Sequence, residues 1–534
     1  MPARAGGGLV RRGLVWAVVV TLTTAALLMA TASPAMAHAT LLSTTPTGDE
    51  LLSRGPDAVK LRFDEPVEVV DGAIRVFGPS GDRVDRGDVA VDGATLRAPF
   101  DSDAQGTYTV AWRVLSEDSH NLEGSFVFHI GTRTGATDID EADDALTEGA
   151  GTAGRLLALA GTLVLFGATL LRVLNGPDPV VADRLRLLAI IGAAAGVLGT
   201  ALILVARASE SSGRPLADAI SLLPDLATDT RTGRLTAARA LALGAGLGAA
   251  ASRRTSRQTP WLPLALVAAA MALVSVSGHA WTADQRLLAT AADIGHQLAA
   301  GTWVGGAVGL LATLRLSTNR SRLARRFSAV ALGSAATVAV TGTVSAVINL
   351  GSWDALTSTG YGQLVAVKVA GFVILITFGW LNRRHLVPLV ERAATPLVRS
   401  LRWEVLVALA VVAVTAVLID QPPGRTSVAQ PFNDSASVEE ATVQLTVDPA
   451  RTGANDLHLY FYDATSGESL PVDAVEITAA TGDLPPRRLD VVPVTTNHVS
   501  VLGASFTAPG NWTVEVTLVR SGAPTTITFE VPIR

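Results

Sequence analysis

Eight apolar segments of nearly bilayer-spanning length follow one another through the middle of this 534-residue chain. A helix needs about 20 apolar residues to cross the hydrocarbon core of a membrane. The mean hydropathy of +0.39 excludes a disordered chain, and a net charge of −5 argues against a nucleic-acid-binding protein. We therefore expect a polytopic α-helical membrane domain of about eight spans. The expected spans are 154–174, 185–206, 235–251, 261–279, 289–314, 327–350, 363–381 and 403–419.

The arginines predict which way this membrane domain is oriented. The segments that would lie on the inner side carry sixteen arginines and the outer loops carry five, as the positive-inside rule requires. Residues 38–150 have a net charge of −13 and residues 420–534 a net charge of −8, whereas residues 151–419 have +13. An even number of spans returns the chain to its starting side. We therefore expect a multi-pass plasma-membrane protein whose acidic N- and C-terminal domains are both extracytoplasmic.

The first 37 residues have the three parts of a secretory signal peptide. Arg4, Arg11 and Arg12 form a positive segment, Leu14–Met29 is apolar, and Ala35-Met36-Ala37 is a small-x-small cleavage site. Cleavage there would make His38 the first residue of the mature chain. An uncleaved membrane anchor is the alternative, and the Arg11-Arg12 pair leaves open whether export follows the Sec or the Tat route.

Residues 38–132 alternate apolar and polar side chains, which is typical of half-buried β-strands. Val59, Leu61 and Phe63 share one face of a predicted strand, and Lys60 and Arg62 share the other. Several such strands separated by Gly, Pro and Asp turns predict a small antiparallel β-sandwich. An acidic linker, residues 133–153, follows this domain.

Candidate metal ligands lie at two places in this domain. An N-terminal His38 would offer its α-amine and its ring Nδ1, and Cu(II) favours such nitrogen-rich coordination. Asp118 and His120 are two residues apart, so in an extended segment they lie on one side and could complete the site. The chain has no Cys, and Met271 is its one Met after signal-peptide removal. Nitrogen and oxygen ligands are therefore expected, which favours Cu(II) over Cu(I) in this domain.

These residues occur in a context that resembles CopC, a periplasmic copper-binding β-sandwich. The resemblance implies that His38, Asp118 and His120 are the Cu(II) ligands. It does not imply the Met-rich Cu(I) site that some CopC proteins carry, because the mature domain contains no Met. We expect His129, on the outward face of a strand, to be exposed to solvent. The matching stretches are His38-Ala39, Phe63 to Val67, Gly106 to Tyr108, Trp112 to His120 and Gly124 to Phe128.

Ionisable residues in or beside membrane spans are functional candidates. His279 ends the fourth predicted span, and Asp293 and His296 lie three residues apart on one face of the fifth. An alternative for His279 and Asp293 is a position in water at the membrane interface. Lys368, near the start of the seventh span, is expected to extend toward the outer surface, and Glu404 to pair with Arg402 or Arg399.

Residues 151–419 resemble CopD, a polytopic copper-resistance membrane protein, most strongly from Ser277 to Gly309. The resemblance implies that His279, Asp293 and His296 form an intramembrane copper path, in which any Cu(I) step would depend on histidine. In the same stretch, Gly301, Gly305 and Gly309 recur every four residues and predict close helix packing. The other matching positions are Tyr361 to Leu364, Lys368, Asn382-Arg383 and Glu404.

The end of the chain again alternates apolar and polar residues. Residues 420–440 are predicted to be a linker, and residues 441–534 look like a YtkA-like domain, a small extracytoplasmic β-sandwich. His458 and His498 are its two imidazoles. Neither has a ligand partner at a diagnostic spacing in the sequence, so we expect isolated surface or loop histidines.

The sequence as a whole favours copper transport across the plasma membrane, with import the direction that the resemblance implies. It contains no G-x-x-x-x-G-K-[ST] nucleotide site, and we expect a transporter rather than an enzyme. The alternatives are a copper-tolerance or buffering factor, a copper monooxygenase, and an electron-transfer protein with haem between His279 and His296. The expected partners are copper ions and the lipid bilayer, with an extracytoplasmic copper chaperone or reductase left open and no nucleic acid.

Overall fold

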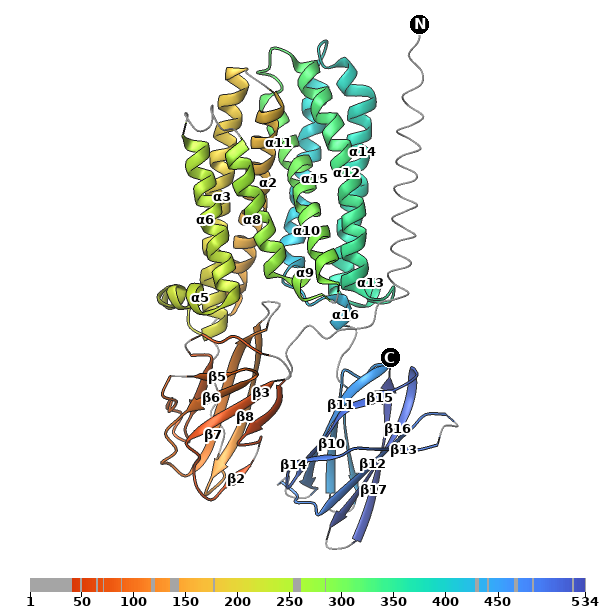
Figure 1. The fold of residues 1–534 in the computed structure, drawn as a ribbon. Coiled ribbons are helices and arrows are strands. Elements are labelled where there is room, and N and C mark those ends of the chain that lie inside the picture. The colour runs from red at the N-terminus through yellow and green to blue at the C-terminus, as the bar shows by residue number, and fades with distance from the viewer. Residues whose placement is uncertain are drawn as a thin grey trace.

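The computed structural model consists of a helical bundle with two β domains at the same end of it (Figure 1). Along the chain, a β domain, a set of long helices and a second β domain follow one another in the expected order. The structure describes residues 41–48, 50–63, 66–70, 72–87, 89–116, 121–134, 144–175, 178–252, 261–283, 285–427, 432–438, 441–464, 469–482, 485–520 and 523–533.

Two sheets form the N-terminal domain, with strand orders β1-β3-β6-β5 and β2-β8-β7-β4. The pairs are antiparallel except that β2 runs parallel to β8, which corrects the expectation of a wholly antiparallel domain. This pairing arises because β2 is only two residues long and adds to the free edge of β8. The strands are β1 Leu41–Thr45, β2 Leu51–Leu52, β3 Ala58–Phe63, β4 Ile74–Phe77, β5 Ala90–Asp92, β6 Thr95–Pro99, β7 Gly106–Leu115 and β8 Asn121–Ile130.

Both sheets contribute side chains to one core. In β3 the alternation is as predicted, with Val59, Leu61 and Phe63 buried and the residues between them exposed. In β7, by contrast, all ten residues are buried. One face of β7 packs in the core, where Tyr108 stacks on Phe128 with ring centroids 5.3 Å apart, so other parts of the molecule must cover its second face.

Most helices of the bundle begin before the apolar runs that predicted them. Five of those described are long and apolar enough to cross a membrane: α2, α3, α12, the helical stretch that begins with α14, and α15. α2 begins at Asp144, inside the predicted acidic linker, and α4, η1 and α5 were not predicted because each is far shorter than a membrane span. The helices are α2 Asp144–Asn175, α3 Pro179–Ser212, α4 Leu216–Ala219, η1 Ile220–Leu222, α5 Leu223–Asp229, α6 Arg231–Ala251, α8 Trp261–Ser277, α9 His279–Thr282, α10 Arg286–Ala300, η2 Gly301–Gly305, α11 Gly306–Thr313, α12 Arg320–Leu350, α13 Ala355–Ser358, α14 Gly360–Leu381, η3 Asn382–Leu386, η4 Val387–Leu389, α15 Ala394–Leu418 and α16 Gly424–Ser427.

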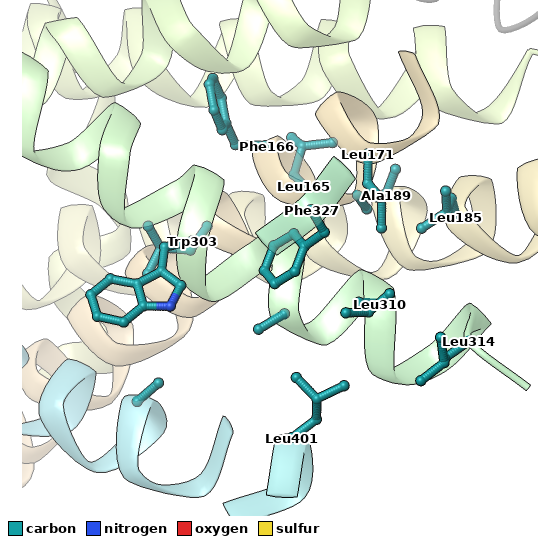
Figure 2. Packing of buried hydrophobic residues seen from close by; sticks show 14 of the residues in the cluster. Leu165, Phe166, Leu171, Leu185, Ala189, Trp303, Leu310, Leu314, Phe327 and Leu401 are labelled. Atoms are coloured by element: carbon teal, nitrogen blue, oxygen red, sulfur yellow. The ribbon is translucent and has the colours of Figure 1, made fainter. Parts of the chain in front are cut away.

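Small residues allow the helices of the bundle to pack closely, as the glycine spacing predicted. A Cβ added to Gly305 would overlap the carbonyl group of Leu163, and one added to Gly167 would overlap the backbone at Gly305. The backbones of α2 and η2 therefore touch directly. Figure 2 shows larger side chains of the buried hydrophobic cluster of the bundle, including Phe166, Trp303 and Phe327.

The C-terminal domain also has two sheets, with strand orders β14-β15-β11-β10-β9 and β13-β12-β16-β17. β9 lies within the predicted linker and pairs with β10, so that linker is shorter than expected. The sequence of β9, FNDSASV, did not predict a strand, because its side chains are mostly polar and exposed and show no apolar alternation. The strands are β9 Phe432–Val438, β10 Ala441–Asp448, β11 Gly453–Asp463, β12 Ala474–Ala480, β13 Arg487–Leu489, β14 Val492–Thr495, β15 His498–Phe506, β16 Gly510–Arg520 and β17 Ala523–Ile533.

The N-terminal domain is docked on the helical bundle at the end where β7 finishes. Leu115, the last residue of β7, and Val70 share a buried apolar cluster with Ala208 of α3 and Leu226 of α5. Arg113 donates a hydrogen bond from Nη1 to the carbonyl oxygen of Glu210 at 3.3 Å. The buried second face of β7 is explained in part by this contact.

Candidate functional site

The three predicted Cu(II) ligands, His38, Asp118 and His120, lie outside the described residues. The residues beside them in the sequence are described. Leu115 pairs with Asn121 where β7 and β8 meet, so Asp118 and His120 belong to the connection between these two strands.

The start of β1 and the end of the β7–β8 hairpin lie at the same end of the domain. Leu41 of β1 pairs with Phe63 of β3, and the ring of Phe63 packs edge-on against Trp112 of β7 at a centroid distance of 5.5 Å. Gly124, the partner of Trp112 in β8, leaves room for the indole, because an added Cβ would collide with it. His38 precedes Leu41 by three residues, a reach of roughly 10 Å in an extended chain.

A series of short contacts joins this end of the domain to the membrane bundle. Glu68 and Leu115 exchange two backbone hydrogen bonds of 2.8 Å. The carboxylate of Glu68 accepts a hydrogen bond from the backbone N–H of Arg231 at 2.6 Å. The guanidinium of Arg231 donates to the carbonyl oxygen of Val276 at 2.9 Å and lies 5.5 Å from the ring centroid of Trp281. These contacts lead from the hairpin to the α8–α9 connection.

His279 and Asp293 lie in the two helices that follow this connection, α9 and α10. His279 is the first residue of α9, directly after that connection. Asp293 of α10 accepts hydrogen bonds at Oδ2 from the hydroxyl of Ser275 at 2.6 Å and from the amide of Gln297 at 2.8 Å. Gln297 also donates to Ser275 Oγ at 2.9 Å, so the three side chains form a closed polar group between α8 and α10.

His296 lies on α10 one turn from Asp293 and faces α12. Its Nδ1 is 3.1 Å from the hydroxyl oxygen of Thr341. Lys368 of α14 is half-buried and interacts electrostatically with both Asp293 and His296, and its extension toward the outer surface stays a prediction. Asp293 and His296 thus lie one turn apart on α10, as their spacing predicted, and Lys368 adds a positive charge within electrostatic range of both.

Glu404 has different partners from those expected. Its Oε1 accepts a hydrogen bond from Trp303 Nε1 at 3.1 Å, and its Oε2 accepts one from Asn382 Nδ2 at 2.8 Å. The predicted pairing with Arg402 or Arg399 was wrong because Glu404 is buried on the inner face of α15, where Trp303 and Asn382 reach it.

Histidines outside the membrane bundle also differ from expectation. His129 is buried rather than exposed, and its Nδ1 lies 2.9 Å from the hydroxyl of Thr107, because the segment after β8 folds back over this face. His458 and His498 are not isolated: His458 Nδ1 and His498 Nε2 are 3.3 Å apart on neighbouring strands. Antiparallel pairing, which a linear spacing rule does not capture, brings them together.

Within the described ranges, no three His, Cys, Asp or Glu side chains lie close enough to one another to hold a metal ion. The predicted N-terminal ligand set is outside those ranges, and the intramembrane group offers one carboxylate and one imidazole with neutral hydroxyl and amide donors beside them.

Three family models match separate parts of the chain. The CopC domain matches residues 41–131, the N-terminal domain of copper resistance protein D-like proteins matches residues 146–287, and copper resistance protein D matches residues 321–418. The CopC match covers the N-terminal sheets, and the other two cover the helical bundle.

Similar proteins agree with this division. The chain is 24% identical over 468 residues to the copper transport protein CutJ of Bacillus subtilis, covering 83% of this chain and 85% of that protein. It is 32% identical to protein YobA of Escherichia coli K12 over 18% of this chain and 79% of that protein. A crystal structure of CopC from Methylosinus trichosporium OB3b covers 18% of this chain and 97% of its own, at 29% identity and a TM-score of 0.16.

Proposed function

Since this chain belongs to the copper resistance proteins that join a CopC domain to CopD domains, we propose that it captures Cu(II) outside the cell and conducts copper inward through the plasma membrane. The capture site consists of the α-amine and imidazole of His38 together with Asp118 and His120. Copper then passes to His279, Asp293 and His296. The observation that carries this proposal is the contact between the β7–β8 end of the CopC domain and the outer end of the helical bundle.

The chemistry of the capture site suits Cu(II). Two imidazoles, one amine and one carboxylate supply nitrogen and oxygen ligands, which Cu(II) accepts in tetragonal geometry. The meeting of β1 and the hairpin at one end of the domain supports bringing His38 near Asp118 and His120. A fourth protein ligand would also block the open position that oxygen chemistry needs, so we propose a binding and transport protein rather than an enzyme.

We propose that the chain crosses the membrane eight times. The five long apolar helices account for five crossings. We assign the others to α6, to the 17-residue α8, and to the run from α10 through η2 to α11, which is continuous from Arg286 to Thr313. With eight crossings both β domains are extracytoplasmic, which agrees with their position at one end of the bundle (Figure 1). We propose that each of these outer domains is a β-sandwich formed by its two sheets.

The intramembrane residues supply a negative charge and an imidazole at the level where copper would leave water. The ammonium group of Lys368 interacts electrostatically with Asp293. A copper ion bound by Asp293 would repel this ammonium group. Any reduction to Cu(I) requires an external electron donor, so a reductase or a copper chaperone is the partner that we propose outside the membrane.

Uptake of isotopically labelled copper by cells tests the proposal. We expect His120→Ala and His296→Ala to abolish the uptake that the wild type adds over an empty vector. His385→Ala is the matched control, because His385 is exposed at the other end of α14 and lies outside the proposed path. Wild-type uptake equal to the empty vector, with copper tolerance still improved, would contradict transport and favour the buffering function.

Two further measurements test the capture site and the intramembrane site. N-terminal sequencing of the mature protein should begin at His38, and any other start removes the proposed amine ligand. The purified protein should show no haem Soret band, since His296 is assigned to copper. A haem band lost in His296→Ala would instead support electron transfer.

A further inference from the structure

Two histidines of the C-terminal domain have no part in the proposed transport path, and antiparallel pairing makes them neighbours. His458 lies in β11 and His498 begins β15. His458 pairs directly with Ser500, and Tyr460 pairs with His498. His498 and Ser500 are two residues apart on one strand, so their side chains share a face with His458.

The donor atoms of these three side chains converge. His458 Nδ1 is 3.3 Å from His498 Nε2, and Ser500 Oγ is 2.9 Å from the first nitrogen and 3.3 Å from the second. Two nitrogens and one oxygen therefore occupy the corners of a nearly equilateral triangle. A hydrogen bond between neutral imidazoles uses only one lone pair, whereas an ion above the triangle would use a lone pair from each corner.

The surroundings hold these side chains in place. His498 and Ser500 are 5% and 3% exposed. The ring of Tyr460 stacks on the ring of His498, with centroids 4.1 Å apart and an interplanar angle of 12°. His458 is only partly buried, which leaves the group open to solvent on one side. Fixed ligands and an entry side are what a preorganised metal site requires.

The protonation state of the two rings is compatible with metal binding. Burial and, to a smaller extent, the neighbouring His458 lower the pKa of His498 to about 4. Burial also lowers the pKa of His458, although Asp456 and Asp448 oppose this shift. Both rings are therefore neutral near pH 7, and a proton does not compete for their lone pairs.

We propose that His458 and His498, with Ser500 as a third donor, bind one Cu(I) ion on the C-terminal domain. The choice of copper rests on the proposed function of the chain. With metal–nitrogen distances of about 2.0 Å, a nitrogen separation of 3.3 Å gives an angle of about 110° at the metal. This angle suits a three- or four-coordinate d¹⁰ ion such as Cu(I). Adjacent ligands in a square-planar Cu(II) site would be only about 2.8 Å apart.

Copper titration of the purified full-length protein in lipid nanodiscs tests this site. Cu(I) is supplied under anaerobic conditions against a chromophoric Cu(I) chelator, and bound copper is counted. We expect the wild type to bind one more Cu(I) per chain than His498→Gln or His458→Gln. His129→Gln is the matched control, because it removes a buried, hydrogen-bonded histidine from the other β domain and should leave the count unchanged. Equal counts in the wild type and both C-terminal variants would overturn the proposal.

A second variant and a second measurement distinguish loss of the copper site from loss of folding in the histidine variants. Ser500→Ala keeps both imidazoles and should keep the copper count, with an affinity lowered by about tenfold. In the unmodified protein, Cu(I) should protect His458 from diethyl pyrocarbonate, while the exposed His385 stays reactive. Absence of protection at saturating Cu(I), or protection by Zn(II) alone, would overturn the assignment to copper. Neither readout depends on uptake, so failure of transport would leave this result standing.

Discussion

The two β domains of this protein carry their histidines in opposite ways. In the N-terminal domain, the proposed ligands lie outside the described residues, and the end of β7 that precedes two of them in the sequence contacts the bundle. In the C-terminal domain, His458 and His498 lie on the face of a sheet. The hydrophobic cluster of that domain is drawn from its own residues, 432–533, whereas Val70 and Leu115 share a cluster with the helices. The first arrangement suits handing a metal on, and the second suits holding it.

The largest effect is expected from removing a ligand of the proposed N-terminal Cu(II) site. His120→Ala should weaken Cu(II) binding by more than about 100-fold, because loss of a group that merely orients a ligand already costs 10–100-fold. Isothermal titration of the purified protein with Cu(II) measures this. Cu(I) bound at the C-terminal domain should not change. A parallel loss of both would show that the two sites are not independent, contrary to the comparison above.

Acid should destabilise the C-terminal domain of the metal-free protein more than the N-terminal domain. The pKa of His498 is about 4 in the folded state and about 6.5 when unfolded, so the unfolded state binds more protons between these values. Stability is therefore full above pH 6.5 and falls as the pH drops to 4, by up to about 3 kcal/mol.

Hydrogen exchange of β15 and β8, corrected for the pH dependence of intrinsic exchange, measures this difference. The double variant His458→Gln, His498→Gln should lose most of the pH dependence of β15. If β8 and β15 in the wild type lose protection to the same extent, burial of the histidine pair is not the cause.

Uncoupling the N-terminal domain from the bundle should produce a moderate effect. Glu68→Ala removes the carboxylate that accepts the Arg231 N–H, and a hydrogen bond to a charged group contributes about 1.5–3 kcal/mol. We expect copper uptake to fall by about tenfold while Cu(II) affinity stays unchanged. Asp101→Ala is the control, since it removes an exposed ion pair with Arg86 in the same domain. Equal losses in both variants would argue against a role for the contact.

The smallest effect is expected between the two β domains. Arg133 donates to Ser469 Oγ at 3.3 Å in an exposed contact. Arg133→Ala should change the stability of either domain by no more than about 0.5 kcal/mol, as for most surface substitutions. Denaturant unfolding measures this change. A loss of several kcal/mol would mean that the domains stabilise each other and do not act separately.

Local sequence patterns predicted the helices and strands of this fold better than the contacts between distant residues. The alternation of Val59, Leu61 and Phe63 and the spacing of Gly301, Gly305 and Gly309 each report a single strand or helix face, and both agree with the structure. The short strand β9 was missed because its exposed polar residues carry no periodic apolar signal.

The pairings that depend on tertiary structure were beyond such patterns. His458 and His498 are forty residues apart, and only the register of β11 against β15 makes them adjacent. Glu404 similarly bonds Trp303, 101 residues away, in place of the arginines beside it in sequence. A buried polar residue at a core position is the one signal that could have flagged Glu404, since such a group requires a partner.

On the proposed transport path, the docking of β7 against α3 and α5 would also affect how fast copper moves. A domain held by Leu115, Arg113 and Glu68 would not diffuse between capture and delivery. The proposed membrane site would therefore meet a captured ion at an effective concentration of roughly millimolar, however scarce copper is outside. Under such conditions the rate of entry depends on how quickly the first site refills and becomes insensitive to the affinity of the second.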